Sequence, residues 1–151
     1  MFSIVLMIIN LIILLGIWAY SIKNYSKLPQ RIPIHFNFEG EADNFAGKKF
    51  FFLLPIVSII ICILFSFIFY HPENNNYPVD ITKENALFQF YLGSIFSQII
   101  LGICLSLFLV IQIYTVKYIA QQKPSLVGLA ICIVLLFITI VAYFIISNIY
   151  K

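Results

Sequence analysis

The stretch FFFLLPIVSIIICILFSFIFY, residues 50–70, contains 21 residues and no charged side chain. A helix needs about 20 predominantly apolar residues to cross a hydrocarbon layer of roughly 30 Å. No water reaches the backbone in that layer, so each N–H and C=O group must pair within the segment, which favours a helix. Residues 2–22, 87–113 and 126–149 form three further uncharged apolar runs of sufficient length. The sequence therefore predicts an all-α membrane protein, a single domain of residues 1–151 with four transmembrane helices.

The composition agrees with this class. Hydrophobic residues make up 62% of the chain and charged residues only 10%, whereas an average soluble domain is about 25% charged. A disordered chain, a disulfide scaffold and an ordinary soluble enzyme are excluded. The runs do not alternate apolar and polar residues, so they do not fit a membrane β-barrel. We expect a multi-pass protein of the cell membrane (the plasma or inner membrane).

The distribution of basic residues predicts an orientation. Short cytoplasmic loops carry an excess of Lys and Arg. The opposite side of the membrane would hold only Lys83 and Lys151. The segments after the first and third runs share one side and hold seven basic residues: Lys23, Lys27, Arg31, Lys48, Lys49, Lys117 and Lys123. We therefore expect these two loops in the cytoplasm and both termini outside.

Polar side chains inside the spans are few and uncharged. No Asp, Glu, Lys, Arg or His occurs in a span, which disfavours a proton-coupled or ion-coupled transporter. Asn10 lies in the first run, and Ser94, Ser97, Gln98 and Gln112 lie in the third. They either line a polar path or form hydrogen bonds between helices; we favour the second interpretation.

The third run also contains small residues at a spacing that lets helix backbones approach closely. The two pairs are Gly93 with Ser97 and Gly102 with Ser106. We expect this helix to be the packing centre of the bundle. Its partners are either helices of the same chain or a second copy in a homo-oligomer.

The loop between the first two runs, YSKLPQRIPIHFNFEGEADNFAGK at residues 25–48, has a different pattern. Ile32, Ile34, Phe36 and Phe38 alternate with other residues, which is typical of a strand with one apolar face. Glu39 and Gly40 then form a turn signal, because glycine adopts a positive φ at little cost. Residues 41–45 could return as a second strand. We predict a small β-hairpin that lies on the membrane face. Its four alternating apolar side chains should pack against the ends of the helices.

This loop resembles the family catalogued as domain of unknown function 1648. The residues that carry the resemblance are Leu28, Pro29, Ile32, Pro33, His35, Phe36, Asn37, Gly40, Asp43 and Lys48. They fit a pattern L-P-x-x-I-P-x-H-F-[DN]-x-x-G-x-P-D-x-W-x-x-K, with Ala42 in place of Pro and Phe45 in place of Trp. We treat these ten residues as the candidate binding or structural motif.

The resemblance also implies a biological context. The domain occurs in bacterial SdpI-type membrane proteins, which are linked to immunity against a secreted toxin and to holding a repressor at the membrane. Those proteins are longer, with six helices and a further C-terminal motif that has no counterpart here. The chain is similar to a short, four-helix form of the family.

His35 is the motif residue with the most alternatives. A hydrogen bond from His35 to Asp43 or to a backbone carbonyl would fix the hairpin, and we favour this role. A metal ion held with Glu39, Glu41 and Asp43 is chemically reasonable, as is contact with a partner. Asp43 and Lys48 could also pair across the turn.

The leading functional hypothesis is a non-enzymatic protein that binds a protein partner, as an immunity factor or as a membrane-anchored signalling component. We expect no cofactor, bound metal ion or nucleic acid; the sequence has no phosphate-binding loop or nucleophile motif. One alternative is a membrane-embedded metal-dependent protein or enzyme centred on His35 and Asp43. Another is a small transporter or lipid-binding bundle. The segment at residues 71–80 is interpreted as a connector, and would be the exposed candidate if a toxin partner acts outside.

Overall fold

The computed structural model describes residues 2–122 and 124–151. Its four helices are α1 (Phe2–Tyr25), α2 (Leu53–Tyr70), α3 (Ala86–Ile119) and α4 (Val127–Ile149). The strands β1 (Arg31–Phe36) and β2 (Ala42–Gly47) form an antiparallel hairpin between α1 and α2. The 3-10 turns η1 (Lys48–Phe52) and η2 (Pro72–Asn74) lie before and after α2. All four helices are long and apolar enough to cross a membrane, so the predicted architecture is confirmed.

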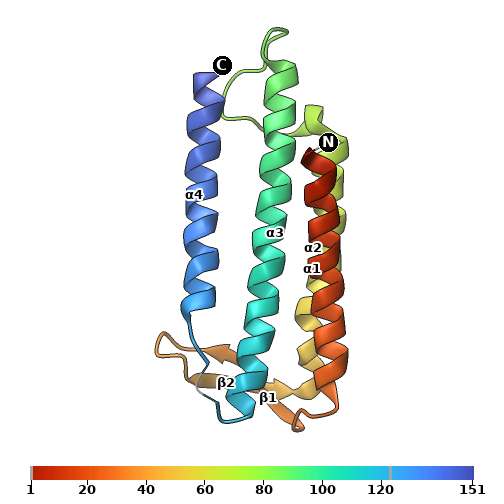
Figure 1. The fold of residues 1–151 in the computed structure, drawn as a ribbon, viewed down its shortest axis with the longest axis vertical. Coiled ribbons are helices and arrows are strands. Elements are labelled where there is room, and N and C mark those ends of the chain that lie inside the picture. Colours follow the sequence, from red (N-terminus) through yellow and green to blue (C-terminus); the bar gives the residue numbers. More distant parts are fainter. Residues whose placement is uncertain (1, 123) are drawn as a thin grey trace.

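The helices lie side by side, and both termini are at one end of the bundle (Figure 1). The hairpin and the α3–α4 connection are at the other end, together with the end of α3 (Figure 1). The first and third loops therefore share one end, as the sequence predicts. We call it the hairpin end.

Helix α3 is the packing centre. It packs against α1, α2 and α4, whereas α1 and α2 touch each other much less. Ile17 of α1 joins Leu101 and Leu105 of α3 in the main buried cluster. Helix α4 packs on α3, and most of its remaining surface is exposed to the surroundings. The prediction that the third helix is the hub is confirmed.

Buried amides connect α3 to α1. Asn10 Nδ2 donates to the Gln98 side-chain Oε1 at 2.9 Å and to the Gln98 backbone carbonyl at 3.0 Å. Further along α3, the Ser21 hydroxyl of α1 donates to Gln112 Oε1 at 2.5 Å. Gln112 Nε2 in turn donates to the carbonyl of Phe51 in η1 at 2.9 Å. These contacts confirm the interpretation as helix–helix hydrogen bonds for Asn10, Gln98 and Gln112. Ser97 instead donates to the Ser94 carbonyl of its own helix.

A further buried amide, which the sequence reasoning did not single out, connects α3 to α4. Gln89 is fully buried, and its Nε2 donates to the Ser147 carbonyl at 3.0 Å. The Ser147 hydroxyl donates back to Gln89 Oε1 at 2.7 Å.

Glycine has a packing role where α1 meets α3. A Cβ on Gly102 would come within 2.7 Å of Asn10 Oδ1, so the absence of a side chain leaves room for the Asn10 amide. Gly93 has a different neighbour from the one predicted. It lies beneath the ring of Tyr77, in the α2–α3 connection, and not against another helix.

The largest departure from the predicted boundaries is at the end of α3. The expected span ends at residue 113, but the helix continues to Ile119. The extra turns carry Tyr114 and Tyr118, which both bond to the hairpin. Tertiary contacts therefore extend this helix beyond its apolar run.

We expect Gln112→Leu to lower the stability of the bundle, because the buried Phe51 carbonyl loses its donor. The loss should be about 1–2 kcal/mol, since an unpaired buried polar group is costly. Thermal unfolding followed by circular dichroism in detergent measures it. Thr139→Val is the control, because the Thr139 hydroxyl bonds only to the Leu135 carbonyl of its own helix. Equal midpoints for the two variants would contradict the bridging role of Gln112.

Candidate functional site

The hairpin is present as predicted, but its buried face is not the predicted one. Ile32 is buried and Phe36 is half-buried. Ile34, however, is 44% exposed and Phe38 fully exposed. The pairing register shifts on both sides of His35, between Pro33 and Phe36. Each shift moves the following side chains to the other face. The alternation of apolar residues in the sequence therefore does not predict which side chains are buried.

The turn of the hairpin is built by Asn37 and Gly40. Asn37 Oδ1 accepts the backbone N–H groups of Glu39 at 3.0 Å and Glu41 at 2.9 Å. The Gly40 N–H donates to the Asn37 carbonyl at 2.9 Å. Gly40 has φ +81°, a conformation that glycine adopts without steric cost. This confirms the positive φ predicted at Gly40.

Two tyrosines of α3 hold the hairpin against the bundle. The Tyr114 hydroxyl donates to the Gly40 carbonyl at 2.8 Å, and the Ala42 N–H donates to the Tyr118 hydroxyl at 3.3 Å. The Phe36 ring packs edge-on against both tyrosine rings, with centroid distances of 4.8 Å and 5.2 Å. The hairpin is therefore docked on the end of α3 and is not a free linker.

The base of the hairpin has its own small core. Leu28, Ile32 and Phe51 are buried together there. Tyr20, Tyr25, Val116 and Ile119 pack around them. This core joins the ends of α1 and α3 to the start of the hairpin.

Lys48 does not pair with Asp43, so that expectation is wrong. The Lys48 ammonium lies 4.7 Å above the centre of the Tyr25 ring, a geometry in which the ring attracts the cation. The backbone N–H of Lys48 donates to the Gln30 carbonyl at 2.9 Å. Asp43 contacts His35 instead, and the antiparallel pairing of the strands brings these two residues together.

His35 and Asp43 form the contact that the sequence favoured. Nδ1 of His35 lies 2.5 Å from Oδ1 of Asp43, and the side chains are 66% and 46% exposed. An exposed pair of this kind contributes about 0–1 kcal/mol to stability. Among residues 2–122 and 124–151, no group of three or more His, Cys, Asp or Glu side chains is placed to hold a metal ion.

The motif residues therefore divide into two sets. Most of them build or anchor the hairpin: Leu28, Ile32, Pro33, Phe36, Asn37, Gly40 and Lys48. Pro29, His35 and Asp43 are exposed. We use the name hairpin surface for the exposed side chains of Ile34, His35, Phe38, Asp43 and Phe45.

Comparison with known proteins shows that part of the chain is similar to a described domain. The family model described as "Domain of unknown function (DUF1648)" matches residues 12–59, from the middle of α1 through the hairpin into α2. An uncharacterized protein of Archaeoglobus fulgidus is 33% identical over 78 residues, covering 46% of this chain and 43% of that protein. The match thus spans less than half of that relative. No solved structure matches the chain. Neither description connects the chain to SdpI-type proteins.

We expect Gly40→Val to loosen the hairpin. A side chain at this position would collide with the Tyr114 hydroxyl, and a non-glycine residue held at this φ costs about 1–3 kcal/mol. Trypsin should then cleave after Arg31 and after Lys48, the two ends of the hairpin, faster than in the wild type. Gly47→Ala is the matched control, because an added Cβ there meets no atom within 4 Å and the φ of Gly47 is −64°. Equal cleavage rates in all three proteins would show that the docked turn is not needed for order.

Proposed function

We propose that the protein is a non-enzymatic membrane protein that binds a cytoplasmic protein partner through the hairpin surface, as a membrane-anchored signalling component. The main support for this proposal is that the motif residues form two sets, one that builds the hairpin and one that is exposed. Buried motif residues fix the hairpin on α3, whereas His35 and Asp43 face outward and add little to the fold. A rigid element that presents exposed side chains is suited to recognition.

The chemistry of the hairpin surface supports binding over catalysis. Phe38 at the turn is fully exposed, and Ile34 and Phe45 are each 44% exposed. These exposed apolar side chains would supply the apolar part of a partner contact. Asp43 adds an acceptor for a cationic or hydrogen-bonding group of the partner. The His35–Asp43 pair has no further ligating side chain from the described residues beside it, so it offers little for a metal-dependent reaction.

The choice of a cytoplasmic partner follows from charge. Among the described residues, the hairpin end holds six basic residues and the end with the termini holds two, Lys83 and Lys151. The six are Lys23, Lys27, Arg31, Lys48, Lys49 and Lys117. Toxin immunity, the other role that the family resemblance implies, is the alternative if the hairpin end lies outside the cell.

Cysteine labelling tests the orientation. In a variant without Cys62, Cys104 and Cys132, single cysteines are placed by Lys27→Cys at the hairpin end and Asn74→Cys at the other end. A membrane-impermeant maleimide should label position 74 and not position 27 on intact cells, and both after permeabilisation. The reverse pattern on intact cells would place the hairpin outside and favour immunity.

Site-specific photo-crosslinking tests partner binding. A benzophenone amino acid at position 38 should form an adduct with one discrete protein in native membranes. His35→Ala and Asp43→Ala should each reduce that adduct at least about tenfold while changing stability by less than about 1 kcal/mol, as for an exposed pair. A crosslinker at position 74 is the control and should not form the adduct. Adducts that these two substitutions leave unchanged, or adducts only with lipid or with a second copy of the chain, would contradict the proposal.

A further inference from the structure

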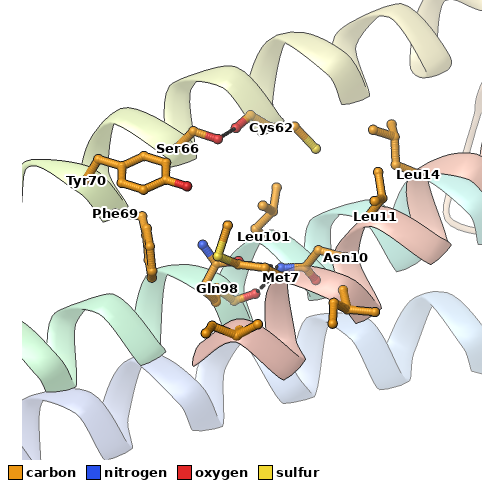
Figure 2. A pocket seen from close by; sticks show the side chains of 12 residues that line it. Met7, Asn10, Leu11, Leu14, Cys62, Ser66, Phe69, Tyr70, Gln98 and Leu101 are labelled. Atoms are coloured by element: carbon orange, nitrogen blue, oxygen red, sulfur yellow. Dashed lines mark hydrogen bonds between the residues drawn. The ribbon is translucent and has the colours of Figure 1, made fainter. Parts of the chain in front are cut away.

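Two parts of the lipid-facing surface differ in charge. A groove of about 670 Å³ lies among α1, α2 and α3, in the half of the bundle nearer the termini, and Figure 2 shows the side chains that line it. None of these side chains is charged, so the groove has no means of selecting one lipid headgroup over another. The hairpin end, in contrast, combines aromatic rings with basic side chains, and charge can select a headgroup.

The base of the hairpin lies where two spans leave the hydrocarbon. The uncharged run of α1 ends at Ile22, and that of α2 begins at Phe50. Arg31, the first residue of β1, pairs with Gly47, which directly precedes Lys48 in η1. Residues this close to the ends of two spans lie at the level of the lipid headgroups. We use the name basic cluster for Arg31, Lys48 and Lys49.

The basic cluster has no counter-ion within the described part of the chain. The ion pairs found there are His35 with Asp43 and His71 with Glu73. Asp43 contacts His35, which lies four residues along β1 from Arg31, or roughly 13 Å at 3.3 Å per residue. Charges in water are largely screened beyond about 8 Å at physiological ionic strength. The carboxylates near the turn of the hairpin therefore do not neutralise its base.

A row of aromatic rings holds one member of the basic cluster in place. The Lys48 ammonium lies 4.7 Å from the centre of the Tyr25 ring. The centroid of the Tyr25 ring is 4.9 Å from that of Phe52, which in turn is 6.0 Å from that of Trp18. An aromatic face attracts a cation but does not neutralise it. The row therefore fixes a positive charge at headgroup level and leaves it available to an anion.

The same row connects the headgroup level to the hydrocarbon. From residue 25 to residue 18 it extends about 10 Å along α1, at 1.5 Å per residue. The rings of Trp18, Tyr25 and Phe52 are only half-buried, so part of each remains open to the surroundings. Tryptophan and tyrosine are enriched at this level of a membrane, because their rings are amphipathic. An occupant that matches both features is anionic at one end and apolar at the other.

We propose that the basic cluster and the aromatic row bind an anionic phospholipid. The phosphate meets the Lys48 ammonium, with Arg31 and Lys49 adding positive charge, and the first part of the acyl chains lies along the rings. Basic sites beside membrane-spanning helices are suited to such headgroups. This site contains no residue of the hairpin surface, so it stands or fails independently of the proposed protein partner.

Quenching of Trp18, the single tryptophan of the chain, tests the proposal. The full chain is reconstituted in phosphatidylcholine vesicles with a rising fraction of phosphatidylglycerol or of phosphatidylcholine that carries brominated acyl chains, which quench a neighbouring tryptophan. Half-maximal quenching should need an at least about fivefold lower fraction of the anionic lipid, because one basic residue near an anionic surface contributes about 1 kcal/mol. Both leaflets have the same composition, so the result does not depend on orientation.

Three glutamine variants locate the effect. Lys48→Gln removes the charge held over Tyr25 and should reduce the preference for the anionic lipid about fivefold, by the same measure. Arg31→Gln should change it in the same direction. Lys83→Gln is the matched control, because it removes one positive charge from the opposite end of the bundle, and it should keep the preference of the wild type. Unchanged quenching by the brominated phosphatidylcholine shows in each variant that the surroundings of Trp18 are intact.

Several results would overturn the proposal. One is equal quenching of the wild type by the two brominated lipids. Another is a preference that Lys48→Gln and Arg31→Gln leave unchanged, or that Lys83→Gln reduces as much as they do, since the effect would then follow net charge alone. A preference that sodium phosphate abolishes, and sodium chloride of equal ionic strength does not, would assign the basic cluster to free phosphate and not to a lipid.

Discussion

The hydrocarbon layer contains no water, so a polar side chain inside it must form its hydrogen bonds within the protein. In this bundle the three buried glutamines of α3 form such bonds to the surrounding elements. Gln98 bonds to Asn10 of α1, Gln112 connects Ser21 and the carbonyl of Phe51, and Gln89 bonds to Ser147 of α4. Between apolar helices in lipid, dispersion and such hydrogen bonds determine which faces meet. These bonds place α1, η1 and α4 around α3, and the weak contact between α1 and α2 follows from this radial arrangement.

The same helix connects the membrane layer to the hairpin. The buried amides fix α3 within the bundle, and in the turns that directly follow its apolar run Tyr114 and Tyr118 bond to the hairpin backbone. Because one continuous helix makes both sets of contacts, the hairpin is held at a fixed position relative to the spans. The exposed His35 and Asp43 are thus presented by a rigid support, although the pair itself contributes little to the fold.

Much of this architecture follows from the sequence, because uncharged length predicts the helix spans and Glu39 with Gly40 predicts the turn. The hydrogen bonds of Asn37 in that turn were not predicted. The contact between His35 and Asp43 was also predictable from hairpin pairing. The buried face of the hairpin was not predictable, because the register shifts near His35 do not appear in the hydrophobic pattern of the sequence. The end of α3 and the position of Lys48 over Tyr25 depend on contacts between distant segments, and local composition does not encode those contacts.

The docking of the hairpin on α3 also has a consequence for the order of events during synthesis. Ala42 bonds to Tyr118, which follows it by 76 residues in the chain. At about 5–20 residues per second, a ribosome needs roughly 4–15 seconds to add them. During that interval the hairpin has left the ribosome but lacks its aromatic support, and an isolated two-stranded hairpin is only marginally stable. The hairpin is made early, directly after α1, and is nevertheless among the last elements to reach its final packing, after the third span has entered the bilayer.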